Sequence, residues 1–438
     1  MLINHTNYNN RRSKSLIFLL ICIFFGVFPH CIDLHKRNSF ILATSLLILF
    51  NGLRILFDGW FKYKRNIILG HKVDFDEVED YPYVDVLVAA KDEENVIVRL
   101  VKMLSKINYP QSRISFWIID DGSKDNTYLI IEEIAKKFPN LNIIKRSKNS
   151  SGGKSGALNF ALNYVKGDWL FVLDADAQVA EDTLLRAIKY ALGNNLSAVQ
   201  LRKSVVNSGV NYLTSFQALE LAMDAVFQCC RDALRGVVEL RGNGQLIHKE
   251  TLITIGSFNE ETITDDLDLS IRLLIENEKV SILWDPPILE EGVDNIFALW
   301  NQRKRWAEGG LQRYFDYWQN LLFGQITLTK KLDFSYFFIL QYALPVISFF
   351  DILASIMTRS LPFYWIISLI VFLISFIAIC LSLINRVEGP ALPKSNALVV
   401  IGAILYLSHW FIIIPWVAVK MAILPKKLNW YKTAHGVN

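Results

Sequence analysis

Apolar stretches close to the length of a membrane span stand at both ends of this chain and leave a polar block between them. Two of these stretches, 16–32 and 39–57, lie near the start, and three more, 335–357, 362–385 and 397–424, lie near the end. A spanning helix needs about 20 mainly apolar residues. The pattern therefore predicts membrane helices on both sides of one domain of ordinary globular composition.

The first apolar stretch could belong to a signal peptide or to a retained anchor. Arg11, Arg12 and Lys14 precede it, as basic residues precede both kinds of segment. No small-x-small cleavage site follows, and a second apolar stretch comes at once. We therefore expect two membrane helices within residues 1–60.

Basic residues also predict an orientation for this multi-pass integral membrane protein. The segments "RRSK" before the first stretch and "KYKR" after the second both favour the cytoplasmic side of a membrane. A domain over 61–300 would then be cytoplasmic, followed by an interfacial helix region over 301–332 and membrane segments over 333–425. Three full spans there would put the basic tail, 426–438, outside, against its charge, so two or three C-terminal spans stay open.

Strand-like and helix-like segments alternate four times in the central block. The strand-like runs lie within 83–90, 114–123, 141–146 and 169–177, the second and fourth running on into acidic residues, and each precedes a helical pattern. This alternation is typical of an α/β domain with a mostly parallel sheet between helices. In such sheets, ligands bind beyond the carboxyl ends of the strands.

Acidic residues follow three of these strands. Asp92 follows the first strand, Asp120 and Asp121 the second, and Asp174 and Asp176 the fourth. A single Asp-x-Asp pair is common as the polar end of a buried strand, but acids at three ends of one sheet would converge and need a cation or a shared proton. Mg²⁺ and Mn²⁺ favour carboxylate oxygens and keep substrate phosphates in their shell. The pattern predicts a nucleotide diphosphate bound through a divalent ion.

A glycine-rich segment, "NSSGGKSGALN", precedes the fourth strand. It is not a Walker A motif, because Lys148 stands where that motif has its first glycine. Lys154 at the expected helix start would still favour an anion. The alternative is an ordinary loop with a solvated lysine.

The segment "ETITDDLDLSIRLL" predicts a helix with Thr264 as its N-cap. Asp265, Asp266 and Asp268 would lie in the first turn, where the helix dipole favours carboxylates. Helix capping alone could explain Asp265 and Asp268.

A basic and aromatic segment, "WNQRKRWAEGGLQRYFDYW", follows the central domain. One interpretation is an interfacial helix whose basic and aromatic side chains lie among lipid headgroups. The other places Gln302, Arg305 and Trp306 at the mouth of the active site, where they would bind a diphosphate and a sugar.

Two features exclude other classes of protein. The net charge of +4 comes from basic residues near the predicted membrane borders, so we expect no nucleic-acid partner. The five cysteines show no Cys-x-x-Cys spacing, which indicates no structural disulfide and no cysteine metal site.

Six short motifs occur in one order over residues 84–306: "VLVAAKDEE", "IIDDGSKDNT", "GGKSGALN", "LDADA", "TDDLDL" and "QRKRW". In this set, the chain resembles the membrane-bound family 2 glycosyltransferases, which have a GT-A fold. "QRKRW" matches the family's Q-x-x-R-W motif. "AAKDEE" and "TDD" depart from the usual Pro/Asn-Glu and Thr-Glu-Asp, although both keep the acidic residue.

The resemblance implies a role for each acidic site residue. Asp92 and Asp120 would hold the uridine of a UDP-sugar donor, with Asp121 as a helper. Asp174 and Asp176 would place Mg²⁺ or Mn²⁺ on the diphosphate, Asp176 more directly.

The same resemblance implies roles for the remaining residues. Asp266 would be the general base that deprotonates the acceptor hydroxyl. Lys154 and Arg305 would add positive charge at the leaving group, and Gln302 and Trp306 would border the acceptor and the donor sugar. One direct displacement would invert the anomeric centre.

Two enzymatic hypotheses for the function stay open, and the sequence argues against a third, non-catalytic one. The segment "RWAEGGLQRYFDYW" looks most like that of the cyanobacterial β-monoglucosyldiacylglycerol synthases, which implies glucose transfer from UDP-glucose to the membrane lipid 1,2-diacylglycerol. Q-x-x-R-W is also typical of processive synthases of the cellulose, hyaluronan or poly-N-acetylglucosamine type. A non-catalytic sensor or scaffold would be expected to lack Asp176 or Asp266, and both are present.

Overall fold

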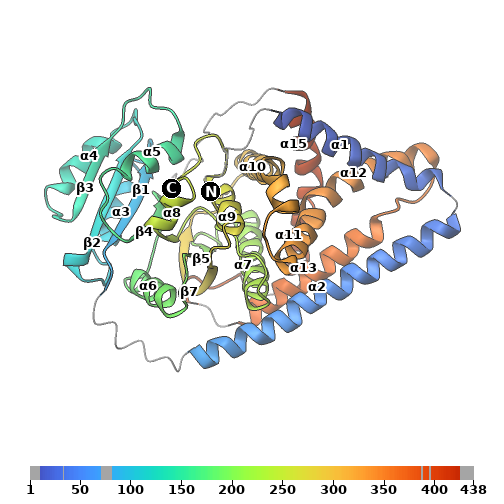
Figure 1. The fold of residues 1–438 in the computed structure, drawn as a ribbon, viewed down its shortest axis with the longest axis horizontal. Helices are drawn as coiled ribbons and strands as arrows, with labels where there is room; N and C mark the ends of the chain where they lie inside the picture. The colour runs from blue at the N-terminus through green and yellow to red at the C-terminus, as the bar shows by residue number, and fades with distance from the viewer. Residues whose placement is uncertain (1–9, 33, 71–80, 386–387, 394–395, 425–438) are drawn as a thin grey trace.

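The computed structural model describes residues 10–32, 34–70, 81–385, 388–393 and 396–424. Figure 1 shows an α/β domain on one side and long helices on the other. The expected basic tail at 426–438 lies outside the described residues.

A seven-stranded sheet forms the centre of the α/β domain. Its strands are β1 (Val84–Ala90), β2 (Ile114–Asp120), β3 (Leu141–Lys145), β4 (Trp169–Asp174), β5 (Ala198–Val205), β6 (Gln245–His248) and β7 (Val280–Glu290). The order across the sheet is β3-β2-β1-β4-β6-β5-β7, and only β6 runs antiparallel to its neighbours. This mostly parallel sheet confirms the predicted α/β class.

Helices cover both faces of the sheet. Those of the domain are α3 (Ile97–Leu104), α4 (Thr127–Ala135), α5 (Gly153–Ala161), α6 (Thr183–Gly193), α7 (Tyr212–Ala233), α8 (Lys249–Thr254) and α9 (Asp265–Ile275). Because strand side chains alternate between faces, Val86 and Val88 pack with α3 and α6, whereas Leu87 packs with α5 and α9. Burial on both faces explains why β1 and β4 are almost continuous apolar runs.

The remaining helices form the second part of the molecule. They are α1 (Arg11–Val27), η1 (Phe28–Cys31), α2 (Leu34–Gly70), α10 (Ile296–Phe323), α11 (Leu328–Phe338), the π-helical turn η4 (Ile339–Ala343), α12 (Leu344–Thr358), α13 (Trp365–Ile384), α14 (Ala397–Leu407) and α15 (Trp410–Ile423). The turn η4 lies directly before Pro345, which has no backbone N–H to donate to the preceding helical turn. Helix α2 continues past residue 60, the expected end of the N-terminal segment.

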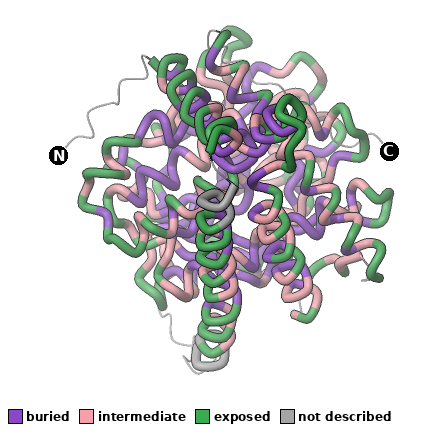
Figure 2. The backbone as a smooth tube through the Cα atoms, turned by 90° about the vertical axis from the view of Figure 1, so that its right-hand side faces the viewer, coloured by how far each residue is buried: buried purple, intermediate pink, exposed green. Residues whose placement is uncertain are grey.

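Five helical segments in the described part of the chain are long and apolar enough to cross a membrane. They are Arg11–Cys31, Ser39–Arg65, Leu328–Thr358, Trp365–Ile384 and Ala397–Ile423. Figure 2 shows exposed residues along the outer sides of the long helices, and large apolar side chains such as Leu47, Phe50 and Met357 are among them. An exposed apolar surface of this kind supports membrane association.

Helix α10 joins the two parts of the molecule. It contacts α9 of the domain as well as α1 and α15. Its residues Gly309 and Gly310 permit this approach, because a Cβ atom at Gly309 would lie 2.2 Å from Oγ1 of Thr264 and one at Gly310 would meet the Tyr342 ring. Near the N-terminus, Arg11 donates through Nε to Oδ1 of Asp316 at 2.8 Å. The first basic residue of the chain is thus paired inside the protein.

The close approach at Gly309 can be tested by substitution. Gly309→Ala should lower the free energy of unfolding by about 1–3 kcal/mol, since the new methyl group overlaps a short, buried side chain. Gly209→Ala is the matched control, because a Cβ atom at Gly209 meets nothing within 4 Å. Thermal unfolding of the detergent-purified proteins measures both, and equal melting temperatures for the two variants would contradict this packing.

Candidate active site

A large cavity opens at the carboxyl edge of the sheet. The strand register aligns Ala90 with Asp120, Asp120 with Lys145, and Ala89 with Asp174. The ends of β1, β2 and β4 therefore lie side by side, and the cavity of about 1110 Å³ begins beside them.

The structure brings most of the predicted site residues to this cavity. Those that line it are Asp121, Lys154, Asp174, Asp176, Asp266, Gln302, Arg305 and Trp306. Asp92 and Asp120 are absent from its lining. The roles of all ten residues stay predictions.

Asp92 and Asp120 make local contacts behind the cavity wall. Asp120 is 1% exposed, and its Oδ1 accepts a hydrogen bond from the backbone of Ser123 at 3.4 Å. The backbone N–H of Lys124 donates to Oδ1 of Asp92 at 2.6 Å. Both carboxylates thus support the loop that follows β2, which also carries Asp121.

Asp121 faces the cavity between two basic side chains. Arg146 donates to its Oδ1, and Nζ of Lys91 lies 3.5 Å from its Oδ2. Burial raises the pKa of Asp121, and Arg146 and Lys91 oppose that shift.

Lys154 and Asp174 form an ion pair across the cavity mouth. Lys154 lies in the first turn of α5, whose N-cap Gly152 has φ +83°. Its Nζ donates to Oδ1 of Asp174 at 2.6 Å. The backbone N–H of Asp174 donates to Oδ1 of Asn243 at 3.1 Å, which holds the end of β4 in place. Lys154 is therefore not the solvated lysine of an ordinary loop.

The first turn of α9 places two carboxylates beside each other. Burial and the neighbouring charge of Asp265 raise the pKa of Asp266 to about 6, although Lys154 opposes the shift. A Cβ atom at Gly242 would lie 3.3 Å from Oδ2 of Asp266, so this glycine leaves room at the carboxylate.

Asp268 and Thr264 have structural positions in the same turn. Asp268 accepts hydrogen bonds from Nε of Arg272 at 2.7 Å and from Oη of Tyr317 at 2.9 Å, which ties α9 to α10. Thr264 stands at the N-cap, as predicted, but its side chain makes no capping hydrogen bond.

Helix α10 contributes the third wall of the site. Burial lowers the pKa of Arg305, while Asp174 and Asp266 favour its charged form. The Oε1 atom of Gln302 is buried without a hydrogen-bond partner. Nζ of Lys203 lies 5.8 Å from the ring centroid of Trp306.

Arg303 fixes α10 beside the cavity, although the sequence reasoning singled out only the nearby Gln302, Arg305 and Trp306. Its guanidinium group lies 4.0 Å from the ring centroid of Trp306. The same group donates to Oε2 of Glu220 at 2.5 Å, and that carboxylate also accepts from Tyr406 at 2.9 Å and from Nε1 of Trp410 at 3.0 Å. These contacts connect the active-site helix with α7, α14 and α15.

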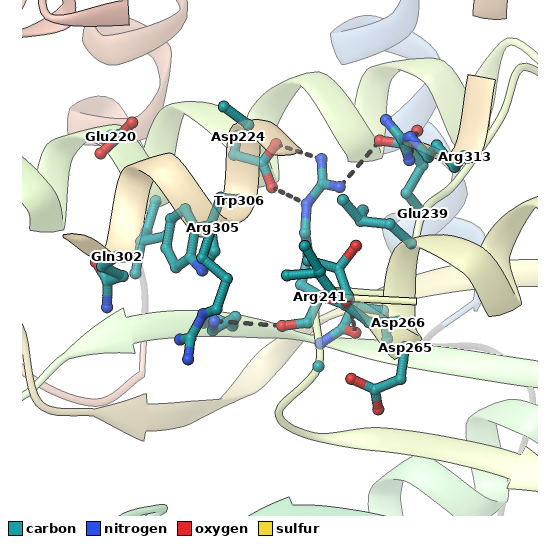
Figure 3. Close-up of a pocket in the computed structure, with 18 of the residues that line it drawn as sticks. Glu220, Asp224, Glu239, Arg241, Asp265, Asp266, Gln302, Arg305, Trp306 and Arg313 are labelled. Atoms are coloured by element: carbon teal, nitrogen blue, oxygen red, sulfur yellow. Dashed lines mark hydrogen bonds and ion pairs between the residues drawn. The ribbon is translucent and has the colours of Figure 1, made fainter. Parts of the chain in front are cut away.

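A second charged group, which the sequence reasoning missed, also lines the cavity (Figure 3). Arg241 donates to both carboxylate oxygens of Asp224, at 3.0 and 2.8 Å, and to Oε2 of Glu239 at 2.9 Å. Arg313 lies 2.7 Å from Oε1 of Glu239. Burial alone would raise the pKa of Glu239, but Arg313, Arg241 and Arg231 outweigh it and lower the pKa to about 2.

The acidic residues at the mouth fit a divalent ion that shares its shell with a ligand. Asp174 and Asp176 both line the cavity and offer carboxylate oxygens, the donors that Mg²⁺ and Mn²⁺ prefer. Among the described residues, no three His, Cys, Asp or Glu side chains group closely enough to hold a metal by themselves. An ion here would need further ligands, and phosphate oxygens are the usual ones.

Carboxylates at the edge of a mostly parallel sheet, faced by a basic helix, are the arrangement expected for a glycosyltransferase with a GT-A fold. The profile of Glycosyl transferase family 2 matches residues 85–226, and that of Glycosyl transferase family group 2 matches residues 169–419. The chain belongs to glycosyltransferase family 2.

Relatives and a solved structure agree with this membership. The chain is 43% identical over 372 residues to the β-monoglucosyldiacylglycerol synthase of Synechocystis sp., covering 81% of this chain and 75% of that protein. It is 36% identical over 438 residues to the synthase of the same name from Nostoc sp., covering 98% of this chain and 90% of that protein. A mannosyltransferase from Pyrobaculum calidifontis, solved with GDP-Man and Mn²⁺, has the same fold with a TM-score of 0.58 at 19% identity, covering 87% of this chain and 99% of that one.

The buried contact behind Trp306 predicts an effect on stability. Glu220→Gln should cost about 3–5 kcal/mol, because it leaves the guanidinium of Arg303 buried without a countercharge. Glu308→Gln is the control on α10, since its partner Lys420 is 44% exposed and such pairs contribute about 0–1 kcal/mol. Denaturant unfolding followed by tryptophan fluorescence reports both changes. If the two variants unfold at the same denaturant concentration, the ion pair between Arg303 and Glu220 does not contribute the expected stability.

Proposed function

We propose that this glycosyltransferase transfers glucose from UDP-glucose to the free hydroxyl of 1,2-diacylglycerol and forms a β-monoglucosyldiacylglycerol. Two relatives with this activity in their name align over most of the chain. The proposal therefore adopts their lipid acceptor and product.

One structural observation supports a lipid as the acceptor. The cavity does not end at the sheet but continues between the membrane helices, where its lining is apolar. Ile55 of α2, Phe227 of α7, Leu340 of η4, Phe372 of α13 and Ile414 of α15 all belong to that lining. A lipid could therefore keep its chains among apolar groups while its hydroxyl group reaches the acidic end.

The polar end of the cavity suits the donor. Lys154 and Arg305 bring positive charge to the place where a diphosphate would leave. Asp174 and Asp176 would hold Mg²⁺ or Mn²⁺, which supplies electrophilic stabilisation of the phosphate oxygens when bound. Asp92, Asp120 and Asp121 would contact or support the uridine, as the family resemblance implies.

The proposed base is Asp266, which lines the cavity together with the residues proposed to bind the donor. As a carboxylate, it would take the proton of the acceptor hydroxyl while that oxygen attacks the anomeric carbon. The new bond to the sugar forms as the bond to UDP breaks, so an α-linked donor gives a β-linked product. Gln302 and Trp306 would border the sugar during this step.

The membrane arrangement follows from the same proposal. The cavity mouth belongs to the sheet domain, so that domain would face the cytoplasm, where nucleotide sugars occur, with the N-terminus on the same side. Among the candidate spans, Leu328–Thr358 contains the π-helical turn η4 before Pro345, and it would be the one that does not cross fully.

The product distinguishes the lipid from the polymer acceptor. Membranes that carry this protein should convert labelled UDP-glucose and diacylglycerol into one chloroform-soluble glycolipid, because the cavity offers an apolar path for acyl chains. Membranes carrying Asp266→Asn should lose this product while retaining UDP binding. Label in insoluble or high-mass material would instead support a processive polysaccharide synthase.

The raised pKa of Asp266 predicts a pH dependence. The base acts as a carboxylate, so kcat/KM should fall as the pH drops through about 6, where the group takes up a proton. Asp265→Asn removes the neighbouring negative charge and should move this fall to lower pH. Steady-state rates measured between about pH 5 and 8 test the shift. If kcat/KM of Asp265→Asn falls at the same pH as that of the starting protein, the proposed coupling between the two carboxylates is contradicted.

A further inference from the structure

An ion pair between Lys203 and Glu290 lines the active-site cavity. Nζ of Lys203 lies 2.6 Å from Oε2 of Glu290, and the two side chains are 12% and 16% exposed. The pair is thus partly accessible rather than sealed in the core. The reaction proposed above gives neither residue a role.

The sheet brings these two side chains to the edge where the other site residues lie. Lys203 is near the carboxyl end of β5, and Glu290 is the last residue of β7. The two strands are parallel, but their register shifts, because Leu201 lies opposite Leu283 whereas Lys203 lies opposite Ile288. Bulges of this kind are frequent next to active sites, where they change the direction of a side chain.

Lys203 lies close to two residues of the proposed reaction, Trp306 and Asp266, which line the same cavity (Figure 3). Its Nζ is 5.8 Å from the ring centroid of Trp306, the side chain proposed to border the donor sugar. The same atom donates to the backbone oxygen of Arg241 at 3.3 Å, and the next residue, Gly242, faces the carboxylate of Asp266. Burial raises the pKa of Asp266, and Lys203 is among the charges that oppose this shift.

A carboxylate, an ammonium group and an indole ring together suit a sugar. A carboxylate accepts hydrogen bonds from hydroxyl groups, and an ammonium group donates to them. Hydrogen bonds with an ionised partner are stronger than those between neutral groups. A site built in this way rejects an analogue that lacks the bound hydroxyl, because a polar group of the protein then loses its partner.

We propose that Lys203 and Glu290 bind hydroxyl groups of the donor hexose and thereby determine which sugar is transferred. The inference rests on the proposed UDP-glucose donor and adds the residues that recognise its sugar. Asp266 would act at the anomeric carbon, so the neighbouring ion pair would contact hydroxyl groups on other carbons of the ring. Trp306 would pack against the sugar beside it.

The test uses UDP-glucose and a series of UDP-deoxyglucoses, each lacking one sugar hydroxyl. The purified full-length protein, in mixed micelles with dioleoylglycerol, should show a kcat/KM at least about tenfold lower for one of these deoxy donors, because a hydrogen bond to a charged group is lost. In Glu290→Gln, the ratio between UDP-glucose and that donor should narrow by about fivefold or more, since an amide is a neutral and weaker partner.

Binding of UDP alone separates sugar recognition from structural damage. UDP has no sugar to contact Glu290, so its Kd should stay within about twofold in Glu290→Gln. Lys203→Gln is the second variant and should also narrow the ratio for a deoxy donor. Asp182→Asn is the control, because it removes a carboxylate that is 48% exposed on α6, and its donor ratios should equal those of the starting protein.

The outcomes distinguish the inference from the proposed function. A narrowed ratio with intact UDP binding supports sugar recognition by the ion pair. If both variants lose the same factor on every donor, or if the starting protein uses all deoxy donors as well as UDP-glucose, the pair has only a structural role and the inference is overturned while the proposed function stands. A starting protein that forms no glucolipid from UDP-glucose would refute the proposed function, and the inference would fall with it.

Discussion

The guanidinium group of Arg241 lies between the carboxylates of Asp224 and Glu239 where the sheet domain meets the membrane helices. Glu239 is 3% exposed, and a buried charge that loses its partners costs about 3–5 kcal/mol, so this carboxylate must be paired. Pairing allows a polar reaction site to lie directly on apolar helices. The same principle holds at Arg303 with Glu220 and explains why α10 is fixed on both sides.

Helix α10 positions several of the proposed site residues relative to one another. One face carries Arg305 and Trp306 into the cavity, while Gly309 lets the helix lie against the start of α9, where Asp266 is placed. Contacts of Arg303 with Glu220, and of Glu220 with Tyr406 and Trp410, hold the helix against α7, α14 and α15. The proposed base on α9 and Arg305 for the leaving group thus both depend on the position of one helix that also contacts the membrane part. This arrangement allows a water-soluble donor and a membrane-bound acceptor to meet.

The amino-acid sequence predicts the local features of this fold well. The four predicted strands, the acidic residues that follow three of them and the apolar spans are all short-range patterns, and the structure has them at nearly the expected positions. The short antiparallel β6 has only four residues and gave no signal of its own.

The pairing of side chains that are far apart in the sequence could not be foreseen either. Asp224 is one of several charged residues of α7, and nothing nearby in the chain indicates Arg241 as its partner. Likewise, Arg303 occupies a variable place in Q-x-x-R-W, so the motif does not single it out.

The central claim is that one cavity connects the donor site with the membrane interior and that the acceptor lipid occupies it. A diacylglycerol with a photoreactive diazirine on one acyl chain, activated on the protein in membranes with UDP present, tests this claim most directly. The account predicts labelled peptides that contain Phe337, Leu340 or Phe372, which line the apolar part of the cavity. Labelling confined to the outer surface, at residues such as Leu47 and Phe50, which are 68% and 70% exposed, would contradict it.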